Sequence, residues 1–253
     1  SYYNPSLYGE NNKSSSINYT YKFPESPFTL TTNFTLNQRQ SDSTISLKLP
    51  TINLNMSRVY PFKKKVKVGK EKWYEKFSLG YNTSLQNRIN FKASEFNKPG
   101  FWDKFQNGMS HNFQIGLPNF TLFKYINITP SVTYGMNWFF RKTEKEYDPD
   151  KGSVVDVKGK SFGTFGATHN YSGSISMSTR LYGMFNFGKH RKLQAIRHVV
   201  TPSLSASFSP EKGTYFNGWR TLTYTDKNGQ VKTQDYNIYA GNIGSYPGKG
   251  KTA

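Results

Sequence analysis

The chain has 253 residues, no cysteine and a formal net charge of +19, which excludes a disulfide framework and a thiolate metal site and indicates an anionic partner. Only 35% of the residues are hydrophobic, and no stretch reaches the roughly 18 apolar residues of a transmembrane helix. The 17% aromatic content argues against disorder, and a membrane β-barrel can be this hydrophilic because only every second strand residue faces lipid.

Three strands are predicted before residue 59, near 14–23, 27–38 and 43–58. Turn-forming residues at 24–27 and 41–43 separate them. In the third strand the apolar residues change parity at Pro50 and Thr51, between Leu49 and Ile52. This change predicts a β-bulge, because one extra residue reverses the faces of the residues that follow it.

The segment 59–74 is strongly basic and precedes a fourth strand, predicted near 75–91. It contains Lys63, Lys64, Lys65 and Lys67, and aromatic residues stand among the lysines that follow. Interleaved basic and aromatic residues could bind single-stranded nucleic acid. We favour a solvated turn with aromatic anchors at the membrane interface, and therefore expect no nucleic-acid partner.

The fifth and sixth strands are predicted near 108–122 and 126–140. In the sixth, the even positions are apolar or aromatic, and the odd positions are small and uncharged except for Phe139. Period-2 alternation is the strand signature. Its length favours a membrane strand of about 9–11 residues or more over a soluble strand of about 5–6. Trp138 and Phe140, at the end of the apolar face, are candidates for a lipid-facing aromatic girdle.

The last two strands are predicted near 166–187 and 195–209, and one face of each is rich in serine. Their neighbours of opposite parity are apolar, such as Met177 and Leu204. Lipid cannot satisfy hydroxyl groups, so the serine faces are expected to point into a barrel lumen. The candidate lumen-facing residues are Ser172, Ser174, Ser176, Ser178, Ser203, Ser205 and Ser207.

Loop lengths predict an orientation in the membrane, because barrels place short turns on the periplasmic side and long loops outside. The long loops at 141–165 and 210–253 are then extracellular, and the second contains Asn228-Gly229, a hairpin signal. The turns near 59–74, 123–125 and 188–194 are then periplasmic. Their basic residues are Lys63, Lys64, Lys65, Lys67, Lys189, Arg191 and Lys192. Strands counted alternately up and down produce the same grouping.

The sequence offers no catalytic or metal-binding motif. His111, His169, His190 and His198 lack the spacing of a zinc site, and neither a G-x-S-x-G elbow nor a P-loop occurs. The segment 148–152 begins like a calcium loop, but glycines replace later ligands. We therefore expect no metal, no cofactor and no enzymatic activity.

These observations predict an all-β fold, in which residues 1–253 form part of a single antiparallel transmembrane β-barrel domain. The wall would comprise about eight long strands of a larger barrel. Its uncharged polar faces, as in 27–38 and 126–140, suit a crowded lumen better than bulk water, where about 25–35% of surface residues are usually charged. The expected location is the outer membrane of a Gram-negative bacterium.

Several motifs resemble one branch of the LptD family, the lipopolysaccharide-assembly barrel. They are RVYPFKKK at 58–65, VGKEKWYEK at 68–76, NGMSH at 107–111, LYGMF at 181–185, LQAIRHVVTPS at 193–203 and the tail from Tyr239 through Gly250. The part at 195–203 is the most specific. The resemblance spans residues 58–253, and residues 1–57 match in strand character alone.

The resemblance implies a barrel of about two dozen strands that follows a periplasmic jelly-roll-like domain. It implies that lipopolysaccharide arrives over a periplasmic bridge and leaves through a lateral seam, while a plug lipoprotein resembling LptE fills the lumen. The chain has too few strands for that barrel and ends in Thr252-Ala253 without a terminal aromatic residue. An internal fragment of the barrel is therefore expected.

The leading hypothesis is a non-catalytic part of the translocon that inserts lipopolysaccharide into the outer leaflet, with lipopolysaccharide, the bridge, the plug and outer-membrane lipid as partners. The alternative is another large outer-membrane barrel, such as a nutrient transporter or a secretion pore. Charged luminal side chains would favour a solute pore, whereas small serine and threonine faces favour a packed plug. A soluble basic β-protein that binds nucleic acid is a third possibility.

Overall fold

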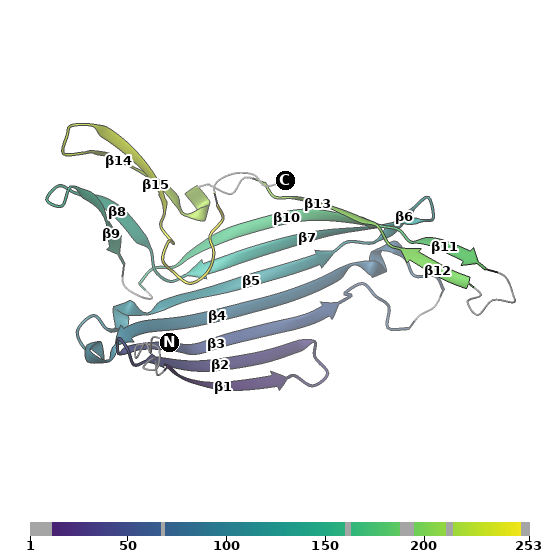
Figure 1. Ribbon diagram of the computed structural model, residues 1–253, viewed down its shortest axis with the longest axis horizontal. Coiled ribbons are helices and arrows are strands. Elements are labelled where there is room, and N and C mark those ends of the chain that lie inside the picture. Colours follow the sequence, from purple (N-terminus) through teal and green to yellow (C-terminus); the bar gives the residue numbers. More distant parts are fainter. Residues whose placement is uncertain (1–11, 67–68, 160–162, 188–194, 211–214, 249–253) are drawn as a thin grey trace, which may run out of the picture.

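Antiparallel pairing of long strands organises the chain. The computed structural model describes residues 12–66, 69–159, 163–187, 195–210 and 215–248. A nine-stranded sheet has the order β1-β2-β3-β4-β5-β7-β10-β13, with the short β6 paired beside β5 on the same edge of β7 (Figure 1). Its strands are β1 (Asn12–Lys22), β2 (Phe28–Arg39), β3 (Thr44–Val59), β4 (Ser78–Lys92), β5 (Gln106–Gly116), β6 (Phe120–Leu122), β7 (Ile126–Phe139), β10 (Gly166–Ser178) and β13 (Ser203–Phe208). The all-β antiparallel fold predicted from the sequence is confirmed.

Three separate hairpins and four short 3-10 helices complete the described chain. The hairpins are β8–β9 (Thr143–Asp148, Ser153–Lys158), β11–β12 (Leu181–Asn186, Ala195–Val200) and β14–β15 (Trp219–Thr225, Val231–Asn237). The helices are η2 (Trp73–Lys76), η3 (Ala93–Glu95), η4 (Trp102–Lys104) and η5 (Tyr215–Asn217). The segments expected as loops at 141–165 and 210–253 thus each contain a two-stranded hairpin.

Three of the predicted strands are interrupted opposite or at a proline. The strand expected at 108–122 divides into β5 and β6 around Pro118. The long hairpin of the last two strands divides into β10–β13 and β11–β12, where the amide of Thr179 donates to the carbonyl of Pro202 at 3.2 Å. Proline has no N–H to donate, so the regular ladder stops at these positions.

The predicted bulge in β3 is confirmed. Between β3 and β4 the register passes from Lys48↔Arg88 to Thr51↔Gln86, and the β2–β3 register shifts at the same place. Leu47 before the shift and Ile52 after it therefore lie on one face, opposite Ile89 and Leu85. The extra residue keeps the apolar side chains of both halves of β3 on the same side of the sheet.

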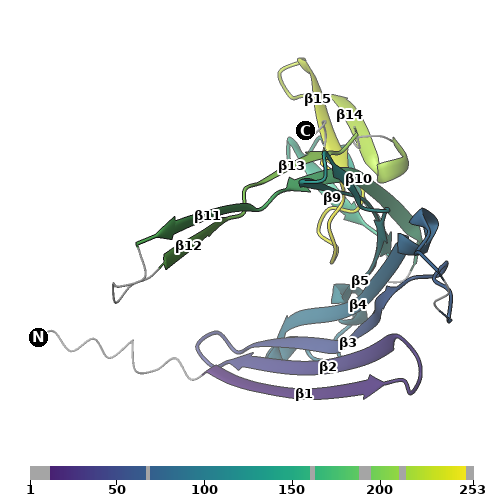
Figure 2. The same ribbon diagram turned by 90° about the vertical axis from the view of Figure 1, so that its right-hand side faces the viewer.

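The sheet is curved, and the chain after β15 lies inside the curve (Figure 2). Asn137 of β7 donates a hydrogen bond from Nδ2 to the carbonyl of Ser245 at 2.7 Å. Phe139, fully buried, stacks on Tyr239 with ring centroids 4.5 Å apart. Asn137 and Phe139 share parity with the serine-rich positions of β10, so the serine-rich face is the concave one. We call it the polar face and its opposite the apolar face.

A second cluster lies on the apolar face. Ile89 and Phe91 of β4 pack with Phe101 from the connection between β4 and β5, and Ile45, Leu47 and Phe105 pack against them. Phe101 contacts Phe91 edge to face at 5.0 Å. This cluster fixes the connection 93–105 at one end of the sheet.

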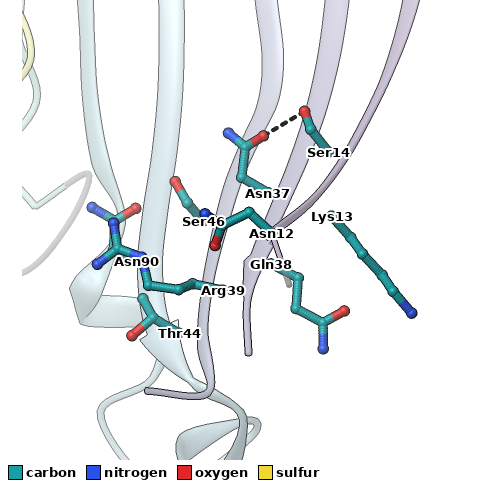
Figure 3. Close-up of a pocket in the computed structure, with 9 residues that line it drawn as sticks. All are labelled: Asn12, Lys13, Ser14, Asn37, Gln38, Arg39, Thr44, Ser46 and Asn90. Atoms are coloured by element: carbon teal, nitrogen blue, oxygen red, sulfur yellow. Dashed lines mark hydrogen bonds between the residues drawn. The ribbon is translucent and has the colours of Figure 1, made fainter. Parts of the chain in front are cut away.

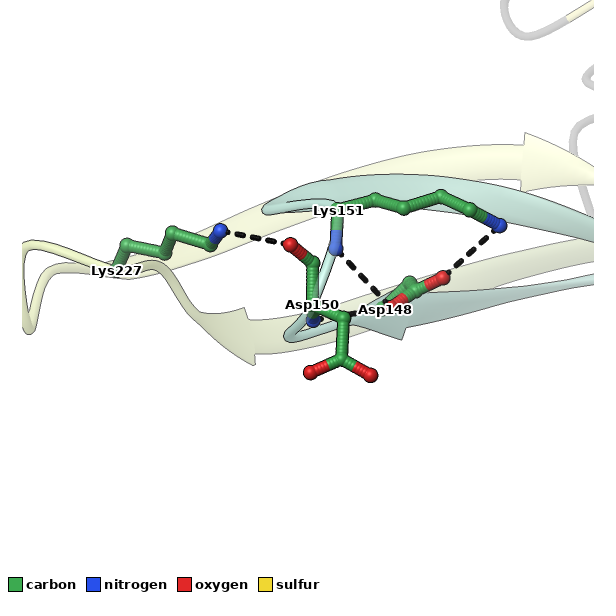
Figure 4. Close-up of polar contacts among 4 residues, drawn as sticks. All are labelled: Asp148, Asp150, Lys151 and Lys227. Atoms are coloured by element: carbon green, nitrogen blue, oxygen red, sulfur yellow. Dashed lines mark hydrogen bonds and ion pairs between the residues drawn. The ribbon is translucent and has the colours of Figure 1, made fainter.

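The two ends of the sheet carry different connecting segments. These segments are divided between the ends in the same way as the loop lengths predicted. Hairpins β8–β9 and β14–β15 project from one end, which we call the hairpin end, whereas the connection 60–77 and hairpin β11–β12 lie at the other (Figure 1). The two hairpins touch: Lys227 Nζ donates to the carbonyl of Asp150 at 2.9 Å, beside the Asp148–Lys151 ion pair (Figure 4). The predicted Asn228-Gly229 turn is confirmed between β14 and β15, where Gly229 adopts a φ of +75°.

The close approach of the chain after β15 depends on glycine at position 108, because a Cβ there would collide with the carbonyl oxygen of Ile243. We expect Gly108→Val to displace residues 239–247 from the polar face. Chymotrypsin should then cleave faster at Tyr239 and Tyr246, as followed by mass spectrometry of the released peptides. Gly173→Val is the matched control, because a Cβ at Gly173 meets nothing within 4 Å. Equal cleavage of both variants and the wild type would show that the segment does not depend on this contact.

Candidate functional site

The polar face of β7, β10 and β13 carries a continuous set of small hydroxyl side chains. The register places Ser174 opposite Ser207, Ser176 opposite Ser205 and Ser178 opposite Ser203. On the other side of β10, the same register places Ser172 opposite Thr133 and Ser174 opposite Ser131. Directly paired residues in an antiparallel ladder share a face, so all the serines predicted to lie together do so.

Some of the hydroxyl groups on this face form hydrogen bonds with one another. Ser131 Oγ and Ser174 Oγ lie 2.7 Å apart. β13 is exposed along its length. Small, uncharged hydroxyl groups of this kind leave space in front of the sheet and can bond to an object placed there.

The opposite face of the same strands is apolar and exposed. Ile175 is 48% exposed and Leu204 is 65% exposed, although both belong to a wall of three hydrogen-bonded strands. Met177 pairs with Leu204 on one side and with Ile128 on the other. A contiguous exposed apolar face of this kind is expected to contact lipid or another apolar surface.

Trp138 and Phe140 lie on the apolar side near the hairpin end and share the neighbour Phe165. Trp138 contacts Phe165 edge to face at 5.7 Å, and Phe140 lies 6.2 Å from the same ring. Trp138 also packs against His111, with ring centroids 4.3 Å apart. The structure therefore brings the two girdle candidates together in one aromatic group.

Two tyrosine–histidine pairs extend this aromatic group across the sheet, and sequence reasoning did not find them. Tyr81 Oη lies 2.8 Å from His111 Nδ1, and Tyr134 Oη lies 2.7 Å from His169 Nδ1. In each pair the residues are diagonal neighbours on adjacent strands. The alternation predicted that they share a face, but only the strand register makes them neighbours. No cluster of three metal-ligating side chains occurs among the described residues.

The basic residues predicted at the other end fall into two groups. Lys63, Lys64 and Lys65 are exposed in the connection between β3 and β4, and Lys63 lies 3.9 Å from Glu71 and over the ring of Tyr60. Lys67, Lys189, Arg191 and Lys192 lie outside the described residues. Lys64 and Lys65 are thus exposed to solvent, and Lys63 contacts one aromatic ring and one carboxylate.

Among the residues that the structure describes, three of the hollows contain cationic side chains, and none was predicted. One of ≈ 440 Å³ lies across the starts and ends of β1–β4 and includes Lys13 and Arg39, together with Asn37 and Ser14, which are joined by a 2.7 Å hydrogen bond (Figure 3). One of ≈ 460 Å³ lies beside the connection 60–77 and includes Arg58, Lys63 and Lys76. The third, of ≈ 370 Å³, lies at the base of hairpin β8–β9 and includes Lys104, Arg141 and Lys158. Each gathers residues distant in sequence, which is why the sequence does not reveal them.

No helix among the residues that the structure describes has the length and apolar character to cross a membrane.

Charge is therefore distributed unevenly over the polar face. The serine-rich positions of β10 and β13 carry none, whereas the hollows at both strand ends carry several cations.

Comparison with known proteins yields one family: a family model described as LptD protein matches residues 1–253. No curated protein and no solved structure matches the chain.

The contrast between the two faces predicts different effects of a carboxylate at neighbouring positions. We expect Trp138→Asp to impair assembly, because its charge would replace an aromatic side chain on the face expected to contact lipid. We expect Asn137→Asp to be milder, because it stays on the polar face and loses a hydrogen bond to Ser245 worth about 1 kcal/mol. The folded fraction in outer-membrane extracts, measured by heat-modifiable gel mobility, compares the two. Equal defects would contradict the assigned faces.

Proposed function

The chain belongs to the LptD family, and from this we propose that it forms part of the wall of the translocon that inserts lipopolysaccharide into the outer leaflet. Membership assigns the chain to lipopolysaccharide transport in the outer membrane. The observation that carries the finer proposal is the long, curved antiparallel wall with one exposed apolar face and one polar face that is uncharged in its serine-rich section. We assign the wall a passive role, without catalysis: it encloses the path of the glycolipid.

The open edges of the sheet support the proposal that this wall is part of a larger barrel. Among the described residues β1 pairs with β2 alone, and β13 pairs with β10 alone. In lipid, each unpaired backbone N–H or C=O group costs several kcal/mol, on the order of 2–7. In this proposal both edges therefore pair with further strands, and residues 1–253 are one section of a single barrel domain.

The polar face supports a lumen filled by a partner protein. Its serines would be costly against lipid, and their small size leaves room for a bulky object inside the curve. In this proposal that object is a plug lipoprotein resembling LptE, while lipid covers the apolar face and a periplasmic bridge delivers lipopolysaccharide. A solute pore is the rival class. Charged luminal side chains would favour it, but the paired positions of β10 and β13 have none, and their small hydroxyl side chains favour a plug.

Photo-crosslinking tests the plug and the faces together. A photo-reactive amino acid at Ser176 or Ser205 should capture a protein partner, because both point from the polar face. The controls are Met177 and Leu204, one position away on the apolar face, which should capture lipid or nothing. Adducts are identified by mass spectrometry from intact cells. A protein adduct at Met177 and Leu204 in place of the serines would refute both assignments.

Thiol labelling tests the orientation, since the chain has no cysteine. Lys151 lies in the tip of β8–β9 and its side chain is 68% exposed, while Lys64 is exposed in the connection at the opposite end. A membrane-impermeant maleimide on intact cells should label Lys151→Cys and spare Lys64→Cys. After the outer membrane is permeabilised, both should react. Labelling of Lys64→Cys alone in intact cells would invert the proposed topology.

A further inference from the structure

The hollow at the base of β8–β9 has the composition of an anion-binding site. Its ≈ 370 Å³ is lined by Gly100, Asp103, Lys104, Gln106, Arg141, Lys158 and Gly159, from the connection between β4 and β5, the start of β5 and both ends of the hairpin. Three cationic side chains and one carboxylate line it. The hollow therefore carries an excess of positive charge at the rim of the wall.

The buried guanidinium of Arg141 is the feature of this hollow that most favours an anion. Its side chain is buried, with the residue 7% exposed, and Nη1 donates to the carbonyl of Asp103 at 2.8 Å. Nε is buried and has no hydrogen-bond partner among the described residues. No described carboxylate forms an ion pair with this guanidinium.

A buried guanidinium without a counter-ion is unfavourable. Arginine stays protonated in proteins, so the charge cannot be relieved by loss of a proton. A buried charge is normally compensated by pairing and by hydrogen bonds to every donor. The positive charge of Arg141, which lines the hollow, is therefore left without a described counter-ion, and an anion that enters the hollow would compensate it.

Two neighbouring lysines add positive charge to the hollow. Lys158 is exposed at the end of β9, next to Gly159. Lys104 pairs with Glu95 at 2.7 Å, and 40% of its side chain is exposed. Two flexible ammonium groups beside a planar guanidinium form a set of donors that suits a phosphate group.

The position of the hollow identifies the source of that phosphate. Gln106 accepts hydrogen bonds from the Arg88 side chain on the polar face of β4 and β5. The carbonyl of Arg141 accepts a hydrogen bond from Asn242 Nδ2, which belongs to the chain inside the curve. The hollow thus lies where the polar face meets the hairpin end. A glycolipid whose sugars follow the polar face would bring its sugar-bound phosphates to this rim.

We propose that the hollow formed by Arg141, Lys104 and Lys158 binds a sugar-linked phosphate of lipopolysaccharide at the hairpin end of the wall. This assignment rests on the proposed function. The guanidinium of Arg141 and the ammonium group of Lys158 compensate the charge of the phosphate, and Gly100 and Gly159 present no side chain that would obstruct the group.

Binding to the full-length protein, purified in detergent with its co-purifying partners, tests the proposal. The probes are lipopolysaccharide from the same bacterium, the same material after enzymatic dephosphorylation, and inorganic phosphate. We expect Arg141→Gln to weaken binding of intact lipopolysaccharide about tenfold, as for the loss of one charge-assisted hydrogen bond, and Lys158→Gln to weaken it several-fold. Dephosphorylated lipopolysaccharide should bind the wild type and both variants equally.

The controls separate charge from folding. Lys232→Gln removes one exposed cation at the same end but outside the hollow, and it should leave the affinity unchanged. Lys158→Gln changes an exposed side chain, so its effect does not depend on the fold tolerating the loss of Arg141. Unchanged affinity in both Arg141→Gln and Lys158→Gln would overturn the proposal, as would inorganic phosphate that displaces lipopolysaccharide at equal concentration, which would identify a site for free phosphate.

The same experiment distinguishes this proposal from the function on which it rests. If the wild type binds lipopolysaccharide and the variants bind it equally well, the phosphate site is refuted and the transport role stands. If the wild type binds no lipopolysaccharide, and depletion of the protein leaves surface lipopolysaccharide unchanged, both are refuted.

Discussion

Backbone hydrogen bonds between antiparallel neighbours join the nine strands of the main sheet, and they decide which side chains share a face. A shift of one residue in any register would exchange the two faces of that strand. The bulge at 48–51 in β3 shows how closely this constraint is kept, since the extra residue restores apolar side chains to one side after Pro50. Everything functional in the wall follows from this separation of faces.

The polar face serves two purposes along its length. Toward the hairpin end it accepts the chain after β15, which packs against Phe139 and passes over Gly108 and Gly166, where any larger residue would collide. Farther along, the serines of β10 and β13 leave the face uncovered by the described chain. The wall is thus filled from within at one end and open to a partner along the rest.

Cationic side chains gather at the strand ends and leave the serine-rich section uncharged. This distribution follows from desolvation: a charge in mid-wall would face either lipid or a closely packed partner, whereas at the ends water and anionic groups are available. It also fits an anionic glycolipid better than a neutral solute. Hollows lined by cationic side chains therefore lie at the ends of the strands.

The sequence by itself determined the long strands of the main sheet, their faces, the bulge in β3 and the Asn228-Gly229 turn, because alternation and turn chemistry act between residues close in the chain. It did not determine where prolines divide three of those strands or that the segment 141–165 forms a hairpin. It also grouped the serines correctly, since parity along two strands requires no knowledge of their path. Only the tertiary structure decided that Phe139, an exception in its face, is buried by Tyr239, and that Arg141 meets Asp103 and Lys158 in one hollow. Those contacts depend on where loops fold back, and no local pattern encodes a meeting between residues that are far apart in sequence.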